Sequence, residues 1–105
     1  MKYEINSNGQ IRLENEKYWI LSGELNNFNR EELSNILTDI ENVLNGKYEN
    51  SSFSKNVIVV GFDKDIAQIE DFDGVIGEES TEDIYKMLKE WLFILQDRES
   101  RQSQQ

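Results

Sequence analysis

Apolar and polar residues alternate near the start of the chain with the period of a β-strand. The segments Tyr3–Ile5 and Ile11–Leu13 each place apolar side chains on one face, and Asn8-Gly9 between them is a strong hairpin signal. Residues 17–21 are aromatic, branched or long, which is typical of a third strand, and Gly23 is expected to end it. The pattern therefore predicts a small antiparallel meander over the first 23 residues.

Two later segments carry apolar residues at the spacing of an amphipathic helix. The first is expected to begin after Asn29, whose side chain forms a capping-box pattern with Glu32, and to stop at Gly46. The second is expected to begin at Ser80 or Thr81. The expected apolar faces are Leu33, Ile36, Leu37, Ile40, Val43 and Leu44 in the first helix, and Ile84, Met87, Leu88, Trp91, Leu92 and Leu95 in the second.

A continuous apolar run lies between the two helices. Residues 56–62 are apolar on both faces, which predicts a central strand covered on both sides or by long neighbouring side chains. A short turn over residues 63–65 leads to its hairpin partner at 66–70. Residues 47–55 are expected to form a polar loop and residues 71–79 an acidic loop.

The elements follow the order strand–strand–strand–helix–strand–strand–helix. We expect a single α+β domain over residues 1–98, in which a mostly antiparallel sheet of about five strands packs with two helices. Residues 99–105 have no apolar anchor and are expected to be a disordered tail. Trp19 and Trp91 are both expected in the core, with Trp91 against the central strand.

The chain contains neither histidine nor cysteine. No Ser–His–Asp or Cys–His arrangement and none of the usual structural zinc sites can therefore form. A glycosidase-like carboxylate pair or a magnesium site would still be chemically feasible, but the acids have no phosphate-binding loop beside them. We expect a protein that is not an enzyme, with no catalytic residue, no metal site and no cofactor.

Compartment and membrane association also follow from composition. A chain without cysteine fits the cytoplasm, and no apolar run follows Met1 as a signal peptide would require. The longest apolar stretch, residues 57–60, is too short to span a bilayer. An acidic chain is repelled by anionic membranes and by nucleic acid, so we expect neither as a direct partner.

The acid is concentrated in one region. The formal net charge is -10, and residues 63–83 contain nine acidic residues and one basic residue, so this region has a net charge of -8 and the rest of the chain a net charge of -2. One interpretation is a solvated segment that aids solubility. The other is a docking surface for a basic protein, which would explain why the mutual repulsion of the acids is tolerated. The candidate partner-binding residues are Asp63, Asp65, Glu70, Asp71, Phe72, Asp73, Glu78 and Glu79.

Two stretches resemble the immunity proteins of bacterial toxin systems, in particular those of contact-dependent growth inhibition. They are residues 56–70, NVIVVGFDKDIAQIE, and residues 80–92, STEDIYKMLKEWL. The resemblance is one of hydrophobic and acidic pattern within a small acidic α+β protein. It implies an inhibitor that binds a secreted toxin domain, commonly a basic nuclease, and blocks its active site. A nuclease needs a positive surface to hold phosphates, and an acidic inhibitor can occupy that surface.

Two other classes of function stay open. One is a nucleic-acid mimic that inhibits a DNA-binding protein, which would present regularly spaced acids over one whole face. The other is a small carboxylate-dependent enzyme.

Overall fold

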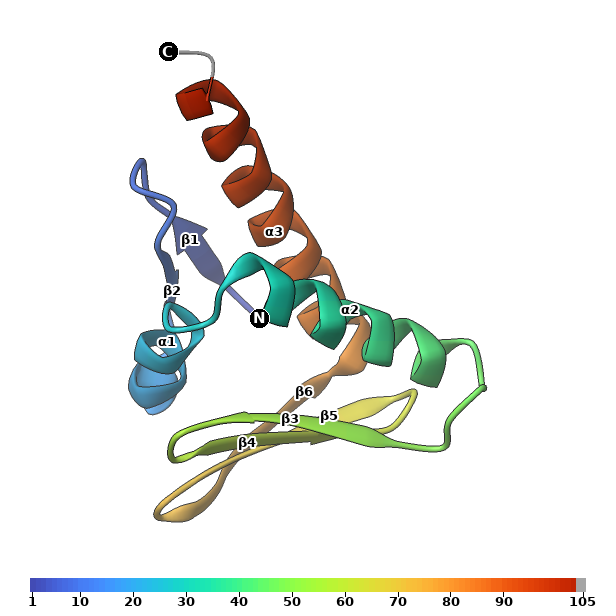
Figure 1. The fold of residues 1–105 in the computed structure, drawn as a ribbon. Coiled ribbons are helices and arrows are strands. Elements are labelled where there is room, and N and C mark those ends of the chain that lie inside the picture. The colour runs from blue at the N-terminus through green and yellow to red at the C-terminus, as the bar shows by residue number, and fades with distance from the viewer. Residues whose placement is uncertain (104–105) are drawn as a thin grey trace.

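The computed structural model describes residues 1–103. A four-stranded sheet carries helices on one face only, and a short two-stranded hairpin lies beside the long final helix (Figure 1). In chain order the elements are β1 (Tyr3–Ile5), β2 (Ile11–Leu13), a 3₁₀-helix η1 (Glu16–Tyr18), α1 (Trp19–Leu25), α2 (Arg30–Leu44), β3 (Ser51–Lys55), β4 (Ile58–Phe62), β5 (Ile66–Asp71), β6 (Gly74–Ser80) and α3 (Thr81–Ser103).

The four-stranded sheet is a simple antiparallel meander in the order β3-β4-β5-β6. Its strands present alternate residues to α2 and α3, and these residues are buried: Ile58, Val60, Phe62, Ala67 and Ile69. The other residues of each strand point away from the helices, because successive side chains of a strand lie on opposite faces. We call this uncovered side of the sheet the open face.

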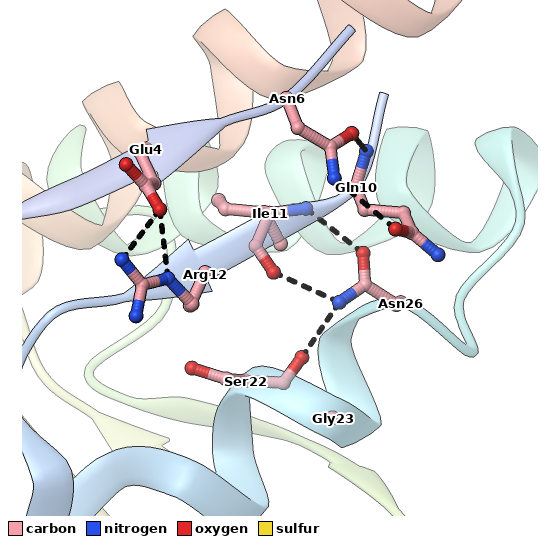
Figure 2. A pocket seen from close by; sticks show the side chains of 8 residues that line it. All are labelled: Glu4, Asn6, Gln10, Ile11, Arg12, Ser22, Gly23 and Asn26. Atoms are coloured by element: carbon pink, nitrogen blue, oxygen red, sulfur yellow. Dashed lines mark hydrogen bonds and ion pairs between the residues drawn. The ribbon is translucent and has the colours of Figure 1, made fainter. Parts of the chain in front are cut away.

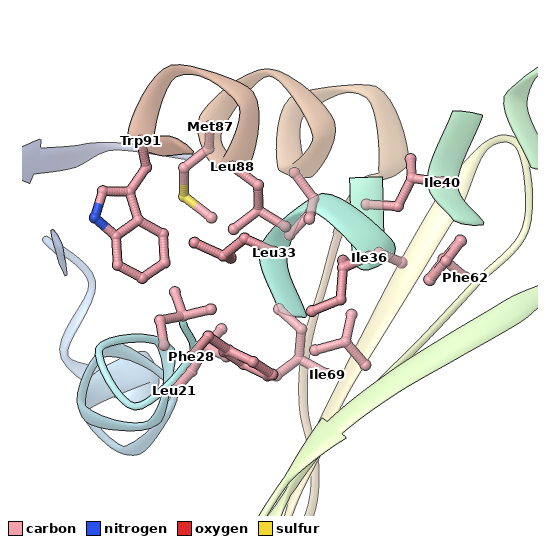
Figure 3. Close-up of a cluster of buried hydrophobic side chains, with 14 of the residues drawn as sticks. Leu21, Phe28, Leu33, Ile36, Ile40, Phe62, Ile69, Met87, Leu88 and Trp91 are labelled. Atoms are coloured by element: carbon pink, nitrogen blue, oxygen red, sulfur yellow. The ribbon is translucent and has the colours of Figure 1, made fainter. Parts of the chain in front are cut away.

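The core lies between the sheet and the helices (Figure 3). Leu33, Ile36 and Ile40 of α2 meet Met87, Leu88 and Trp91 of α3, as the helical spacing predicts. Trp91 is only 2% exposed, which confirms its expected burial, and its indole nitrogen donates a hydrogen bond of 2.8 Å to the Gly9 carbonyl oxygen. The turn between β1 and β2 is thereby tied to α3.

The ends of α2 lie where the sequence predicts them. The Asn29 side chain accepts a hydrogen bond from the Glu32 backbone at 2.8 Å, and the Glu32 carboxylate accepts one from the Asn29 backbone at 3.0 Å. Glu32 also pairs with Lys55 of β3 at 3.0 Å, and these bonds, the backbone bond foremost, lower the pKa of Glu32. At the other end Gly46 has a φ of +80°, the left-handed conformation that stops a helix.

The prediction of a third strand at residues 17–21 is wrong, because this segment forms η1 and the start of α1. Asn15 caps η1 by accepting a hydrogen bond from the Lys17 backbone at 3.1 Å. The residues that α1 and η1 bury, Tyr18, Leu21, Ser22 and Leu25, follow helical spacing.

Side chains of the α1 region take the place of a third strand beside β2. The Ser22 hydroxyl accepts a hydrogen bond from the Leu13 backbone at 2.8 Å. The Asn26 amide accepts from the Ile11 backbone at 2.9 Å and donates to its carbonyl at 2.8 Å (Figure 2). These backbone groups of β2 are therefore satisfied without a third strand. Trp19 is 72% exposed, contrary to its expected place in the core.

Both expected loops also contain strands. Residues 47–55 include β3, in which Phe53 packs edge-on against Phe28 with ring centroids 6.1 Å apart. Residues 71–79 include most of β6, which pairs with β5 along its length. The α+β class is confirmed, but the described residues form six strands in two sheets and three α-helices in place of about five strands and two helices.

Two further expectations differ from the structure. β4 is an interior strand, but it is covered on one side only, and Val59 is 40% exposed on the open face. The sequence pattern predicts a disordered tail from residue 99, whereas α3 continues to Ser103 and Glu99 pairs with Arg30 at 2.7 Å. The last part of that expected tail, residues 104–105, lies outside the described residues.

Candidate protein-binding surface

The candidate partner-binding residues are close together in the sequence, but they lie in four different places in the structure. Asp63 and Asp65 lie in the turn between β4 and β5, at the end of the sheet where α3 begins. The register places Glu70 and Glu78 on the open face, Asp71, Phe72 and Asp73 at the turn between β5 and β6, and Glu79 on the helix-covered face.

Asp63 has a structural role in its turn. Its carboxylate accepts hydrogen bonds from the backbone nitrogens of Asp65 and Ile66, both at 2.8 Å, and these two bonds lower its pKa. The Asp63 carbonyl oxygen accepts a bond of 2.7 Å from the Thr81 hydroxyl. Asp63 therefore fixes the β4–β5 turn and ties it to the first residue of α3, while the Asp65 side chain is exposed.

Glu79 points inward and is engaged by the protein itself. The Tyr18 hydroxyl donates a hydrogen bond of 2.5 Å to the Glu79 carboxylate, and burial, with this bond, raises the pKa of Tyr18. The Tyr18 ring also fills the space where a side chain at Gly77 would lie. This pair joins η1 to β6, so Glu79 is not part of the open face.

The β5–β6 turn presents an aromatic side chain between two acids. The Asp71 carboxylate accepts a hydrogen bond of 2.7 Å from the Asp73 backbone, and Gly74 has a φ of +99°. The hydrogen bond holds the turn in shape. Gly74 allows that shape, because few residues other than glycine adopt a positive φ without strain. Phe72, at the tip, is 68% exposed.

The open face combines apolar and acidic side chains. Cross-strand pairing aligns one row of residues, Ser54, Val59, Glu70 and Val75, and a second row, Ser52, Gly61, Gln68 and Glu78. The second row lines a shallow hollow, because Gly61 has no side chain. Val59 and Val75 are 40% and 53% exposed and lie in the same row as Glu70.

The negative charge of this region is almost unpaired within the protein. Of the nine acids at residues 63–83, only Glu82 forms a salt bridge within the described part of the chain, with Lys86 at 3.4 Å. Glu70, Asp73 and Glu78 have no cationic neighbour at salt-bridge distance among those residues. A cationic partner can therefore pair with the carboxylates of the open face without breaking a salt bridge inside the described residues.

A separate hollow of about 320 Å³ lies between β2 and α1 (Figure 2). It is lined by Glu4, Asn6, Gln10, Ile11, Arg12, Ser22, Gly23 and Asn26. Arg12 pairs with Glu4, and Asn26 bonds the backbone of β2 and of Ser22. These polar groups hold the hairpin to α1, so we assign the hollow a structural role.

The sequence reasoning missed the apolar members of this surface. Val59 and Val75 are exposed because no second layer covers the open face, and Val57 is exposed because it lies in the β3–β4 turn. The apolar run at 56–62 indicated neither. Strand alternation through residues 74–80 would have separated Glu78 from Glu79, had that segment been recognised as a strand.

Among residues 1–103, no helix is both long and apolar enough to cross a bilayer. The same residues contain no group of three or more carboxylates arranged to hold a metal ion. No protein-family model, curated protein or solved structure matches the chain.

Proposed function

We propose that this chain is a cytoplasmic immunity protein that binds a basic toxin domain, of the nuclease type, and blocks its active site. The observation that carries the proposal is the open face, where exposed valines lie beside carboxylates that have no cationic partner in the described residues. The pattern resemblance to immunity proteins points the same way.

An interface of this composition suits a cationic protein partner. Protein interfaces combine apolar and polar groups, and Val59 and Val75, with Glu70 between them, provide both within one row. Unpaired charge near an interface accelerates the encounter with a partner of opposite charge. An inhibitor of a lethal enzyme gains from such rapid capture, because the toxin acts until it is bound.

The sheet is also a suitable support for this surface. Its other face is buried against α2 and α3, so the strands that carry the interface are held by the protein's core. Asp63 and Glu79 contribute to this support through their bonds to the turn and to Tyr18, and we place both outside the contact surface. The proposed contact residues among the original candidates are Asp65, Glu70, Asp71, Phe72, Asp73 and Glu78.

Co-expression with the polypeptide encoded by the neighbouring gene tests the proposal. We expect that polypeptide to arrest growth when expressed alone and to be harmless when this chain is present. With purified proteins, its nuclease activity should fall to zero at a one-to-one ratio.

Three results would contradict the proposal: a harmless neighbouring product, a toxin that this chain does not bind, or catalysis by this chain alone. Binding of a non-toxic DNA-binding protein, with displacement of its DNA, would favour the nucleic-acid mimic instead.

A further inference from the structure

We infer that Trp19 and Phe72 are the two aromatic anchors that hold the basic partner, at the end of the four-stranded sheet where the β3–β4 and β5–β6 turns lie. This inference rests on the proposed function and deepens it, since it assigns the contact that limits dissociation. We call this region the hairpin end. It comprises the turns at residues 56–57 and 72–73 and the neighbouring helix α1.

The register places both turns at the same end of the sheet. Lys55 pairs with Ile58, Val59 pairs with Glu70, and Asp71 pairs with Gly74, so the β3–β4 and β5–β6 turns lie side by side (Figure 1). The β4–β5 turn and the start of α3 lie at the opposite end.

Two hydrogen bonds hold the α1 region to the sheet, and one of them lies at the hairpin end. The Asn56 amide, in the β3–β4 turn, donates to the Glu24 carboxylate of α1. The Tyr18 hydroxyl donates to Glu79, which pairs with Ala67 toward the other end of β6, so this bond fixes η1 against the sheet. Trp19 lies between these two attachments in the sequence, directly after Tyr18, and its backbone is fixed by the burial of Tyr18 and Leu21.

The exposed apolar side chains are unevenly distributed. The described residues include eight large hydrophobic side chains that are exposed, and five of these belong to the hairpin end or to the adjoining row of the open face. They are Trp19, Val57, Val59, Phe72 and Val75, of which Trp19 and Phe72 are the most exposed at 72% and 68%. Such gatherings on a soluble protein mark interaction sites.

The two aromatic residues are suited to tight binding because their backbones are already ordered. Phe72 stands in a turn that is fixed by the Asp71 carboxylate and by the positive φ of Gly74. Tryptophan is among the residues most enriched at interface positions that dominate affinity. An anchor that is ordered before binding loses little conformational entropy in the complex.

The negative charge of the hairpin end determines which kind of partner can bind there. Asp71 and Asp73 flank Phe72, and Glu70 lies in the adjoining row, so a second copy of this chain would place acid against acid. Anionic lipid surfaces would be repelled in the same way. A basic protein satisfies the carboxylates, and its arginine or lysine side chains can also lie over the aromatic rings.

The chain offers a direct reporter and a matched control. Because it has only two tryptophans, incorporation of 5-fluorotryptophan gives two ¹⁹F resonances, and the Trp91→Phe variant identifies that of Trp19. Phe93 of α3 is 70% exposed, close to the 68% of Phe72, but it lies in a groove between α2 and α3. Phe93→Ala therefore controls for loss of an exposed aromatic side chain away from the proposed site.

The probe is the unlabelled toxin domain encoded by the neighbouring gene. We expect it to shift the Trp19 resonance and to leave that of Trp91 in place. Trp19→Ala and Phe72→Ala should each weaken affinity by at least about tenfold, through faster dissociation, and Phe93→Ala by less than about twofold. Circular dichroism and the urea midpoint verify that each variant is folded.

The outcomes separate this inference from the proposed function. If the toxin domain binds but the Trp19 resonance does not move and both alanine variants bind as the parent does, the inference is overturned and the immunity function stands. If the parent does not bind the toxin domain at all, the proposed function and the inference both fail. The ¹⁹F shift is measured on a protein that keeps both aromatic side chains and carries only the fluorine label, so it decides the matter even if an alanine variant folds poorly.

Discussion

Truncation of Trp91 tests how the core holds α3 to the rest of the molecule. The side chain is 2% exposed and donates its N–H to the buried Gly9 carbonyl at 2.8 Å. Trp91→Ala removes the whole buried ring and should lower the free energy of unfolding by about 3–5 kcal/mol. Trp91→Phe retains most of the apolar contact but leaves the Gly9 carbonyl without its donor, which should cost about 1–3 kcal/mol.

Urea denaturation followed by far-ultraviolet circular dichroism measures these changes without relying on tryptophan emission. With a slope of about 1–3 kcal/mol per molar urea, the alanine variant should lower the midpoint by at least about 1 M. Trp19→Ala is the control, because a side chain that is 72% exposed should change stability by no more than about 0.5 kcal/mol. A Trp91→Ala protein with the parent's midpoint, or a Trp19→Ala protein as destabilised as Trp91→Ala, would refute the burial of Trp91 and the exposure of Trp19.

Three further predictions concern individual residues. Asn29→Ala removes the cap of α2 and should cost about 1 kcal/mol, measured as a lower urea midpoint, whereas Asn29→Ser should retain most of the stability. The folded protein holds the pKa of Asp63 below its ordinary value of 3.8, so this carboxylate stabilises the fold above that value and its contribution is lost as the pH falls through the folded pKa. The free energy of unfolding of Asp63→Asn should therefore fall less steeply in acid than that of the parent. The same fall in both proteins would contradict this role. Gly77→Ala places a methyl group against Tyr18 and should destabilise the protein by about 1–3 kcal/mol, whereas Gly61→Ala, which meets no atom within 4 Å, should be far milder in the same urea assay.

Elements that are fixed by their own local sequence were predictable. The hairpin at Asn8-Gly9 and the capping box at Asn29 both depend on residues close together in the chain. The conformation of residues 17–21 was not predictable in this way. Their aromatic and branched composition favours a strand, whereas the residues that they bury have the spacing of a helix. Their conformation depends on Ser22 and Asn26, whose side chains satisfy the backbone of β2 from a distance in sequence.

The candidate surface was predictable in its charge and not in its shape. The excess of acid between residues 63 and 83 is visible in the sequence, and most of those carboxylates are indeed unpaired within the described residues. Some of these carboxylates fix a turn, some lie on the open face and one binds Tyr18. This arrangement depends on β6 being a strand, and the glycines and acids of β6 do not suggest a strand. The aromatic part was hidden further, because an exposed tryptophan and a core tryptophan look alike in a sequence.

The central claim is that the carboxylates of the open face and hairpin end guide a basic toxin domain to this protein. Its most direct test is the association rate of the two proteins at low and high salt, measured for the parent and for Asp73→Lys/Glu78→Lys. Both side chains are exposed and neither holds a turn through its carboxylate. Glu31→Lys/Glu41→Lys on α2 is the control, because it changes the net charge equally at two other exposed positions.

We predict that Asp73→Lys/Glu78→Lys slows association by at least about tenfold at low salt and that the difference narrows at high salt, because salt screens steering by exposed charges. The control variant should slow association much less. If Asp73→Lys/Glu78→Lys associates at the parent's rate at both salt concentrations, or if the control slows it equally, the acidic open face does not guide the partner and the account is contradicted.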